Sequence, residues 1–124
     1  MAEKILLDTS MLIDILDKGR DMQLLKGDCY LSIISIYEYI RYKHNAEEQK
    51  LLLEGAFEVV SFSNPIILKA SEIFVKLKRA GKSVSENDVY IAASAIANRL
   101  RLYTKDADFK EINRLFPEFR VVIV

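Results

Sequence analysis

Short apolar runs alternate with longer stretches of helical periodicity along the whole chain, and this alternation is the strongest restriction on its fold. The apolar runs have the length of β-strands and cover residues 5–7, 29–34, 57–62, 102–104 and 121–124. Strands that are apolar throughout are typical of parallel sheets, because helices cover both faces of such sheets. The pattern therefore predicts an α/β fold in which helices cover a central parallel sheet on both sides.

Residues that start and stop helices divide the segments between these runs. Predicted helices cover 11–17, 35–43, 46–54, 65–80, 86–100 and a short segment that ends near 116. Thr9 or Ser10 is expected to cap the first helix and Ser85 the fifth, because hydroxyl groups accept hydrogen bonds from the free N–H groups of a first turn. Ser35 and Glu38 have the spacing of a capping box, which places the start of the second helix at Ser35.

Composition and charge narrow the class of protein further. The 124 residues fit one domain spanning 1–124, and 51% of them are apolar, which is enough for a core. The 18 basic and 18 acidic residues cancel, so no overall charge indicates a nucleic-acid partner. Cys29 is the single cysteine, which excludes a disulfide within the chain and indicates a reducing compartment. Because no apolar stretch reaches about 20 residues, we expect a soluble, cytoplasmic protein with no membrane partner.

Four acidic residues follow predicted strands or begin predicted helices at one edge of the sheet. Asp8 ends the first strand, and Asp106 comes two residues after Thr104, where the fourth strand ends. Glu38 lies early in the helix after the second strand, and Asp88 begins the long helix that leads into the fourth. Sites in open α/β sheets form beyond the carboxyl ends of the strands. We therefore expect these four carboxylates to meet.

A group of carboxylates with no histidine or thiolate among them predicts a site for a hard cation. Neighbouring carboxylates repel one another, and a bound cation relieves that repulsion. Oxygen ligands favour Mg²⁺ or Mn²⁺, and such ions hold phosphates and activate water. His44, the only histidine, lies in a polar stretch away from these acids. The residues thus indicate a metal-dependent phosphodiesterase.

Helix capping is the competing explanation for most of these acids. Glu38 and Asp88 lie three residues after a serine, and Asp106 or Asp108 could cap the next helix. Acidic groups in a first turn also stabilise a helix through its dipole. Asp8 is different, because an acid that ends a buried strand costs free energy unless it is paired or bound to a cation. The presence of all four acids at one edge of the sheet favours a functional site. One residue can be both a helix cap and a metal ligand.

Four motifs together resemble the PIN-domain proteins. They are LLDTSMLID at 6–14, ISIYEYIR at 34–41, NDVYIAASAI at 87–96 and LYTKDADF at 102–109. The short length is similar to that of the VapC toxins. The resemblance implies a three-layer α/β/α sandwich with a central parallel sheet, an Mg²⁺- or Mn²⁺-dependent endoribonuclease activity on RNA, a homodimer, and a cognate antitoxin that blocks the groove.

The resemblance also assigns roles to residues. Asp8, Glu38 and Asp88 would be the main catalytic and metal-binding acids and Asp106 the fourth, with Asp108 as a further candidate that the motif does not rank against Asp106. Supporting hydroxyl groups would come from Thr9, Ser10 and Thr104.

Cationic and aromatic residues near the motifs are candidates for contacts with RNA. Because RNA is anionic, an acidic site that cleaves it needs positively charged residues nearby. We expect these RNA-binding cations among Arg41, Arg99, Arg101 and Lys105. The tyrosines at 37, 39 and 42 are expected to divide between core and a dimer face, with base stacking as the alternative. Two other functions remain open at this point: a non-catalytic PIN-like module that binds RNA or protein, and an RNA-processing nuclease outside a toxin system.

Overall fold

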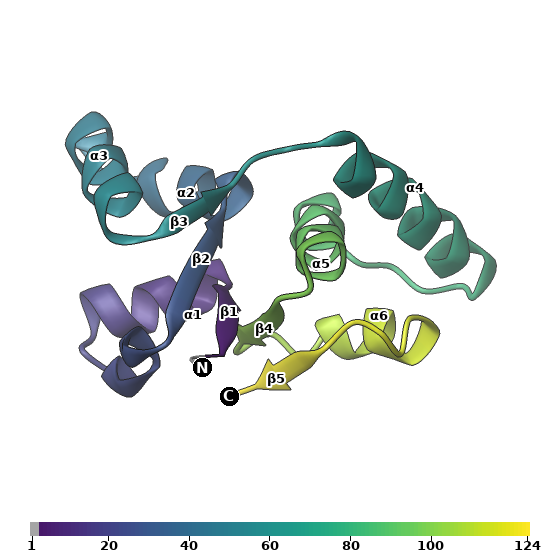
Figure 1. Cartoon of the computed structure of the whole chain (residues 1–124). Helices are drawn as coiled ribbons and strands as arrows, with labels where there is room; N and C mark the ends of the chain where they lie inside the picture. The colour runs from purple at the N-terminus through teal and green to yellow at the C-terminus, as the bar shows by residue number, and fades with distance from the viewer. Residues whose placement is uncertain (1–2) are drawn as a thin grey trace.

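A five-stranded parallel sheet forms the centre of the molecule in the computed structural model, which describes residues 3–124. Its strands are β1 (Lys4–Leu7), β2 (Asp28–Ser32), β3 (Glu58–Val60), β4 (Arg101–Thr104) and β5 (Val121–Ile123). Their order across the sheet is β3-β2-β1-β4-β5 (Figure 1). Each of the five predicted apolar runs overlaps one of these strands, so the predicted parallel sheet is confirmed.

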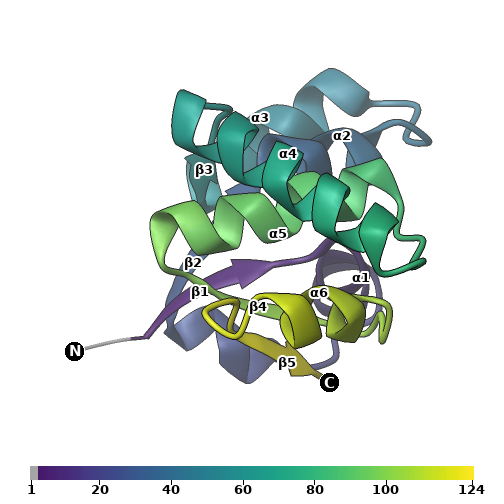
Figure 2. The same cartoon turned by 90° about the vertical axis from the view of Figure 1, so that its right-hand side faces the viewer.

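Helical segments connect the strands and cover both faces of the sheet. They are α1 (Thr9–Leu12), a π-helical turn η1 (Ile13–Asp17), a 3₁₀ segment η2 (Met22–Lys26), α2 (Ile33–Ile40), α3 (Ala46–Ala56), α4 (Asn64–Arg79), α5 (Glu86–Asn98) and α6 (Phe109–Leu115). In Figure 2, α4 crosses in front of α5, which lies between α4 and the strands. Among the described residues no helix is long and apolar enough to cross a bilayer.

Two apolar cores lie on opposite faces of the sheet, because successive strand side chains point to opposite sides. Leu6 packs into the core formed with α4, α5 and α6. Its neighbours Ile5 and Leu7 pack into the core formed with α1, η1, α2 and α3. The same alternation separates Leu102 from Tyr103 on β4. The structure therefore has three layers, helix–sheet–helix, as expected.

The start of α2 differs from the prediction. The helix begins at Ile33, and Oγ of Ser32 caps it by accepting a 3.1 Å hydrogen bond from the N–H of Ile34. The predicted capping residue Ser35 lies inside the helix and is fully buried. Both serines have suitable hydroxyl groups, but the chain leaves the sheet at Ser32, where the backbone is extended. The predicted cap at Ser35 was therefore wrong by one turn.

The first helix also starts earlier than predicted. Thr9 and Ser10 are residues of α1, and Asp8 occupies the capping position. The backbone carbonyl of Asp8 accepts the first hydrogen bonds of the helix, from the N–H groups of Met11 and Leu12. The side chains of Thr9 and Ser10 are thereby free to bind other groups. The predicted capping role of these two hydroxyl groups was wrong.

The strand order places a crossover at the middle of the sheet. The chain progresses from β1 outward to β3 on one side, and then returns to build β4 and β5 on the other. Open α/β sheets bind ligands at this switch point, beyond the carboxyl ends of the two central strands. Asp8 follows one of these ends and Lys105 follows the other. The fold thus gathers the chain's acidic motifs at its expected binding edge.

Candidate active site

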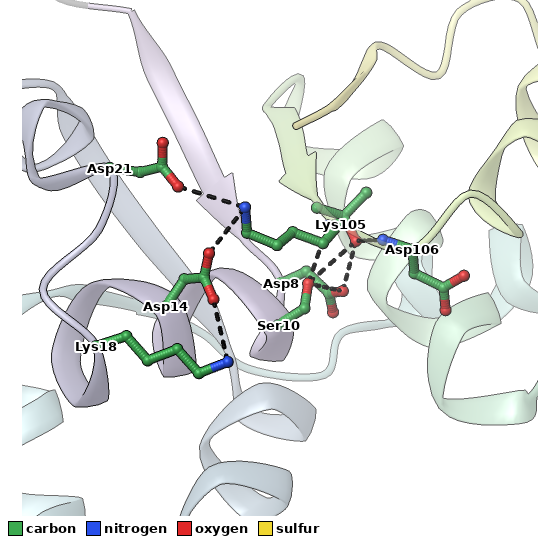
Figure 3. A network of polar contacts seen from close by, with 8 residues as sticks. Asp8, Ser10, Asp14, Lys18, Asp21, Lys105 and Asp106 are labelled. Atoms are coloured by element: carbon green, nitrogen blue, oxygen red, sulfur yellow. Dashed lines mark hydrogen bonds and ion pairs between the residues drawn. The ribbon is translucent and has the colours of Figure 1, made fainter.

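Asp8 lies at the centre of the site, where β1 passes into α1. Its N–H donates a 3.1 Å hydrogen bond to the carbonyl of Tyr103, which extends the pairing of β1 with β4. Its Oδ2 accepts hydrogen bonds from the hydroxyl groups of Thr104, at 2.7 Å, and Ser10, at 3.1 Å (Figure 3). Only 5% of Asp8 is exposed. Strand pairing, the start of α1 and two hydroxyl groups therefore hold this carboxylate in one orientation.

Glu38 reaches the same region from α2. Its Oε1 accepts a 2.7 Å hydrogen bond from the hydroxyl of Thr9, and its Oε2 accepts a 3.2 Å hydrogen bond from the side-chain amide of Asn87. These contacts connect α2 to the start of α1 and the start of α5. The contribution of Asn87 was not predicted. Its only sequence signal is its position next to Asp88 in the third motif.

Asp88 lies in the first turn of α5, and Ser85 caps this helix as predicted, with Oγ accepting a 3.2 Å hydrogen bond from the N–H of Asp88. Burial raises the pKa of the Asp88 carboxyl to about 7, and the negative charges of Asp8, Asp106 and Glu38 add to this shift. A neighbouring charge has this effect only at short range. The four predicted acids are therefore brought together around Asp88.

The loop between β4 and α6 presents Asp106 to the cluster. Its N–H donates a 3.0 Å hydrogen bond to the hydroxyl of Thr104, and its Oδ1 accepts one of 2.9 Å from the N–H of Asp108. Asp106 is partly buried and acts on the pKa of Asp88, whereas Asp108 is exposed where α6 begins. The geometry thus brings Asp106 to the other acids, and Asp108 supports the loop through its backbone.

Burial also raises the pKa of Asp8, and the negative charge of Glu38 acts in the same direction. Hydrogen bonds from Thr104, from the backbone N–H of Thr9 and from Ser10 stabilise the charged form and oppose that shift. The supporting hydroxyl groups predicted from the motifs therefore all contact acids of the cluster. Burial therefore disfavours the charged forms of both Asp8 and Asp88, and the neighbouring acids add to this effect.

The donor set fits a hard divalent cation. In the part of the chain that the structure describes, no group of three or more acidic, histidine or cysteine side chains is positioned to hold a metal ion by itself. Mg²⁺ can bind through fewer protein ligands, because it keeps several of its waters and uses one or two carboxylates. An open cluster of four carboxylates, two of them with raised pKa values, matches that requirement.

Lys105 directs its charge away from the acidic cluster. Its ammonium lies 2.8 Å from Oδ2 of Asp14 and 3.4 Å from Oδ2 of Asp21, while its backbone N–H donates to Oγ of Ser10 (Figure 3). Asp14 is 3% exposed, and its hydrogen bond with Lys105 lowers the pKa of its carboxyl. This pair, in which Asp14 is buried and Lys105 is exposed, was not predicted. One indication was present in the sequence: Asp14 comes three residues after Met11, which is buried, and a buried carboxylate needs a partner.

Of the other three predicted cations, only Arg41 lies near the acids. Arg99 follows the last residue of α5 and Arg101 begins β4, so both lie at the opposite edge of the sheet from Asp8. Arg101 forms a 2.9 Å ion pair with Glu3. Arg41 follows α2, and its pKa is raised mainly by a hydrogen bond with Tyr37 and in part by the negative charge of Glu38. The four cations therefore do not form one patch.

Comparison with known proteins identifies the family of the chain. The family model of the PIN domain matches residues 5–115. The chain is 38% identical over 105 residues to Ribonuclease VapC1 of Methanocaldococcus jannaschii, a match that covers 83% of this chain and 76% of that protein.

Solved structures have the same fold. VapBC2 from Rickettsia felis, bound to a DNA fragment from its promoter, aligns with a TM-score of 0.76 at 24% identity over 95% of this chain and 96% of that chain. DNA-bound VapBC from Salmonella typhimurium aligns with a TM-score of 0.73 at 25% identity over 97% of each chain. The chain belongs to the PIN-domain family and, within it, to the VapC group.

Proposed function

We propose that the chain is an endoribonuclease that hydrolyses RNA phosphodiester bonds with a divalent cation, Mg²⁺ or Mn²⁺, at the cluster of Asp8, Glu38, Asp88 and Asp106. The observation that carries this proposal is the geometry of the cluster: the Thr104 hydroxyl contacts both Asp8 and the backbone of Asp106, and Glu38 is held by Thr9 next to Asp8. Burial, and then the charges of these three acids, raise the pKa of Asp88 to about 7. The relative from Methanocaldococcus jannaschii, named a ribonuclease, supports the choice of RNA.

The contacts of each acid suggest how the four divide the work. Asp8 and Asp88 would hold the principal ion, because a bound cation would offset the cost of charging these two acids, whose pKa values burial raises. Glu38, oriented by Thr9 and Asn87, would position the attacking water, and Asp106 would complete the site from its loop. The cation, when bound, neutralises the cluster and lowers the pKa of a bound water.

The proposed partners of this chain are inferred from its relatives and not from contacts within its own structure. The Salmonella typhimurium structure at 25% identity is a VapBC assembly on DNA. We propose that this chain is likewise the toxin of a toxin–antitoxin pair, held by a cognate antitoxin and assembled as a homodimer. Co-expression with the protein encoded next to it, followed by measurement of the mass of the purified complex, tests both assignments.

Cleavage of total cellular RNA tests the activity directly. The purified protein would be incubated with RNA and Mg²⁺ or Mn²⁺, and new RNA ends mapped by sequencing. We expect discrete cleavage sites that disappear with EDTA, with Asp8→Asn and with Asp88→Asn. Asp28→Asn is the matched control, because Asp28 begins β2 at the opposite edge of the sheet. It should cleave like the unmodified chain.

Two outcomes would contradict the proposal. Cleavage that survives in both Asp8→Asn and Asp88→Asn would place the activity elsewhere or in a contaminating nuclease. RNA binding without cleavage, under every metal condition, would instead indicate a non-catalytic PIN-like module.

A further inference from the structure

Two exposed tyrosines enclose an arginine at the end of α2. Tyr37 is 54% exposed and Tyr42 is 85% exposed. The guanidinium carbon of Arg41 lies 5.3 Å from the ring centroid of Tyr37 and 5.2 Å from that of Tyr42. Tyr39, in contrast, is buried and donates its hydroxyl to Asp17. The predicted division of the three tyrosines therefore leaves two of them on the surface, together with a cation.

This group lies at the end of the helix that carries Glu38 of the acidic cluster. Arg41 comes three residues after Glu38, and side chains three apart on a helix are surface neighbours about one turn from each other. A hydrogen bond with Tyr37 contributes most to the raised pKa of Arg41, and the negative charge of Glu38 adds to it. Glu38 itself points toward Thr9 and Asn87. The tyrosines and Arg41 therefore lie at the end of the helix that carries Glu38, on the α2 side of the acidic cluster.

Arg41 is also the candidate cation whose charge remains available there. Lys105 is held by Asp14 and Asp21, and Arg101 by Glu3. Within residues 3–124, Arg41 forms no ion pair with a carboxylate. A guanidinium has five N–H donors, so Arg41 can bind phosphate oxygens while it also donates to Tyr37. An anionic substrate that approaches four carboxylates needs such a group.

We propose that Tyr37, Arg41 and Tyr42, the Tyr–Arg platform, bind an unpaired nucleotide of the RNA next to the bond that is cleaved. The proposal rests on the proposed ribonuclease function and specifies its substrate as single-stranded RNA, such as a loop. Exposed rings bind unpaired bases by stacking, and bases inside a duplex are not accessible to them. Arg41 supplies the phosphate contact and a tyrosine ring supplies the stacking face.

RNA binding without cleavage isolates this contact from catalysis. The chain carrying Asp88→Asn, in Mg²⁺, would be titrated with a fluorescent single-stranded 12-nucleotide RNA and with a duplex of the same sequence. Stacking on one ring corresponds to about a 10-fold change in affinity. We expect Tyr42→Ala to weaken single-strand binding about 10-fold and Tyr42→Phe to preserve it. Duplex binding should be weak and unaffected by either change.

The phosphate contact has its own readout. Arg41→Gln should lower the slope of log affinity against log salt by about 0.7, the value for one contact to a single strand. Phe74 and Lys78 provide matched controls, because Lys78 lies 5.8 Å from the exposed Phe74 ring on α4, in the opposite helix layer. Phe74→Ala and Lys78→Gln should leave both the affinity and the salt slope unchanged.

Each failure has a distinct signature. If Tyr37→Ala and Tyr42→Ala bind single-stranded RNA as tightly as Phe74→Ala does, the platform proposal is wrong even where the unmodified chain cleaves RNA. Unchanged RNA binding with a changed molecular mass by light scattering would assign the tyrosines to self-association instead. If the unmodified chain never cleaves RNA but these variants still weaken single-strand binding, the nuclease proposal fails and the RNA platform stands.

Discussion

The hydroxyl of Thr104 donates a 2.7 Å hydrogen bond to Oδ2 of Asp8, joining the carboxyl ends of the two central strands. Oγ1 of Thr104 also accepts a 3.0 Å hydrogen bond from the N–H of Asp106. One buried hydroxyl therefore fixes the orientation of one acid and the backbone of another. A threonine that ends β4 is thus part of the site even though it carries no charge.

Replacement of Thr104 by valine tests this relationship, because valine keeps the shape and removes the hydroxyl. We expect Thr104→Val to lower divalent-metal affinity or cleavage by about 10- to 100-fold, the usual effect of losing a group that orients a metal ligand. Thr104→Ser, which retains the hydroxyl, should keep most of the activity. Calorimetric titration with Mn²⁺ and the RNA cleavage assay would measure the two quantities. Equal metal affinity in Thr104→Val and the unmodified chain would contradict the assigned role.

The stability of the metal-free protein should depend on pH through Asp88. Its pKa is raised from 3.8 to about 7 in the folded chain. Between these values the folded chain binds a proton that the unfolded chain does not, so this group lowers stability as pH rises toward 7. Above pH 7 the loss is complete. In EDTA, Asp88→Asn should therefore be more stable than the unmodified chain at pH 8 by about 1–3 kcal/mol, allowing for partial exposure.

Urea unfolding at several pH values checks this prediction. The advantage of Asp88→Asn should shrink steadily as pH falls from 7 to 4. Asp28→Asn, at the other edge of the sheet, should show no comparable trend. Saturating Mg²⁺ should stabilise the unmodified chain far more than Asp88→Asn, because the ion binds only the folded cluster. A constant difference at all pH values would show that Asp88 does not carry the predicted charge.

Local patterns were sufficient to predict the five strands and the order of the main helices, but not η2 or the first residues of α1 and α2. Each strand is a short apolar run, and Pro65 and Gly81 mark the two ends of α4. The parallel direction of the strands then follows from the helices that connect them, because two parallel strands need a crossover connection. Since the carboxyl ends of parallel strands share one edge, the meeting of Asp8 and Asp106 follows from the topology.

Contacts between distant residues could not be predicted in the same way. Asn87 and Glu38 are 49 positions apart, and the pairing of Lys105 with Asp14 depends on how η1 packs beside the β4–α6 loop. Sequence proximity to a motif was also misleading for Arg101, because β4 runs the full depth of the sheet and its two ends lie at opposite edges. Side-chain direction is decided by packing, which a single sequence does not reveal.

Ser32 marks the observed start of α2, and Ser35 marks the predicted start. Oγ of Ser32 caps the helix, so Ser32→Ala should lower the free energy of unfolding by about 1 kcal/mol. The buried Oγ of Ser35 has no hydrogen-bond partner among the described residues, so Ser35→Ala should be neutral or stabilising. Urea unfolding of both variants compares the two positions directly. The reverse order of effects would restore the capping box at Ser35.

The ion pair of Lys105 and Asp14 should support the loop that carries Asp106. The pKa of Asp14 is lowered in the folded chain, so its contribution to stability is present above its unfolded pKa and is lost as pH falls through the folded one. Lys105→Met should therefore lower the Tm at pH 7 and have much less effect near pH 3, whereas Lys105→Arg should retain the pair.

A surface ion pair provides the comparison for this effect. Lys82 lies 3.7 Å from Glu111, and Lys82→Met should leave the Tm nearly unchanged at either pH, because exposed pairs contribute little. If Lys105→Met is also without effect on the Tm but reduces the salt slope of RNA binding, Lys105 contacts phosphate rather than holding the loop. A lower Tm with an unchanged salt slope would instead place its charge on Asp14, where the structure has it.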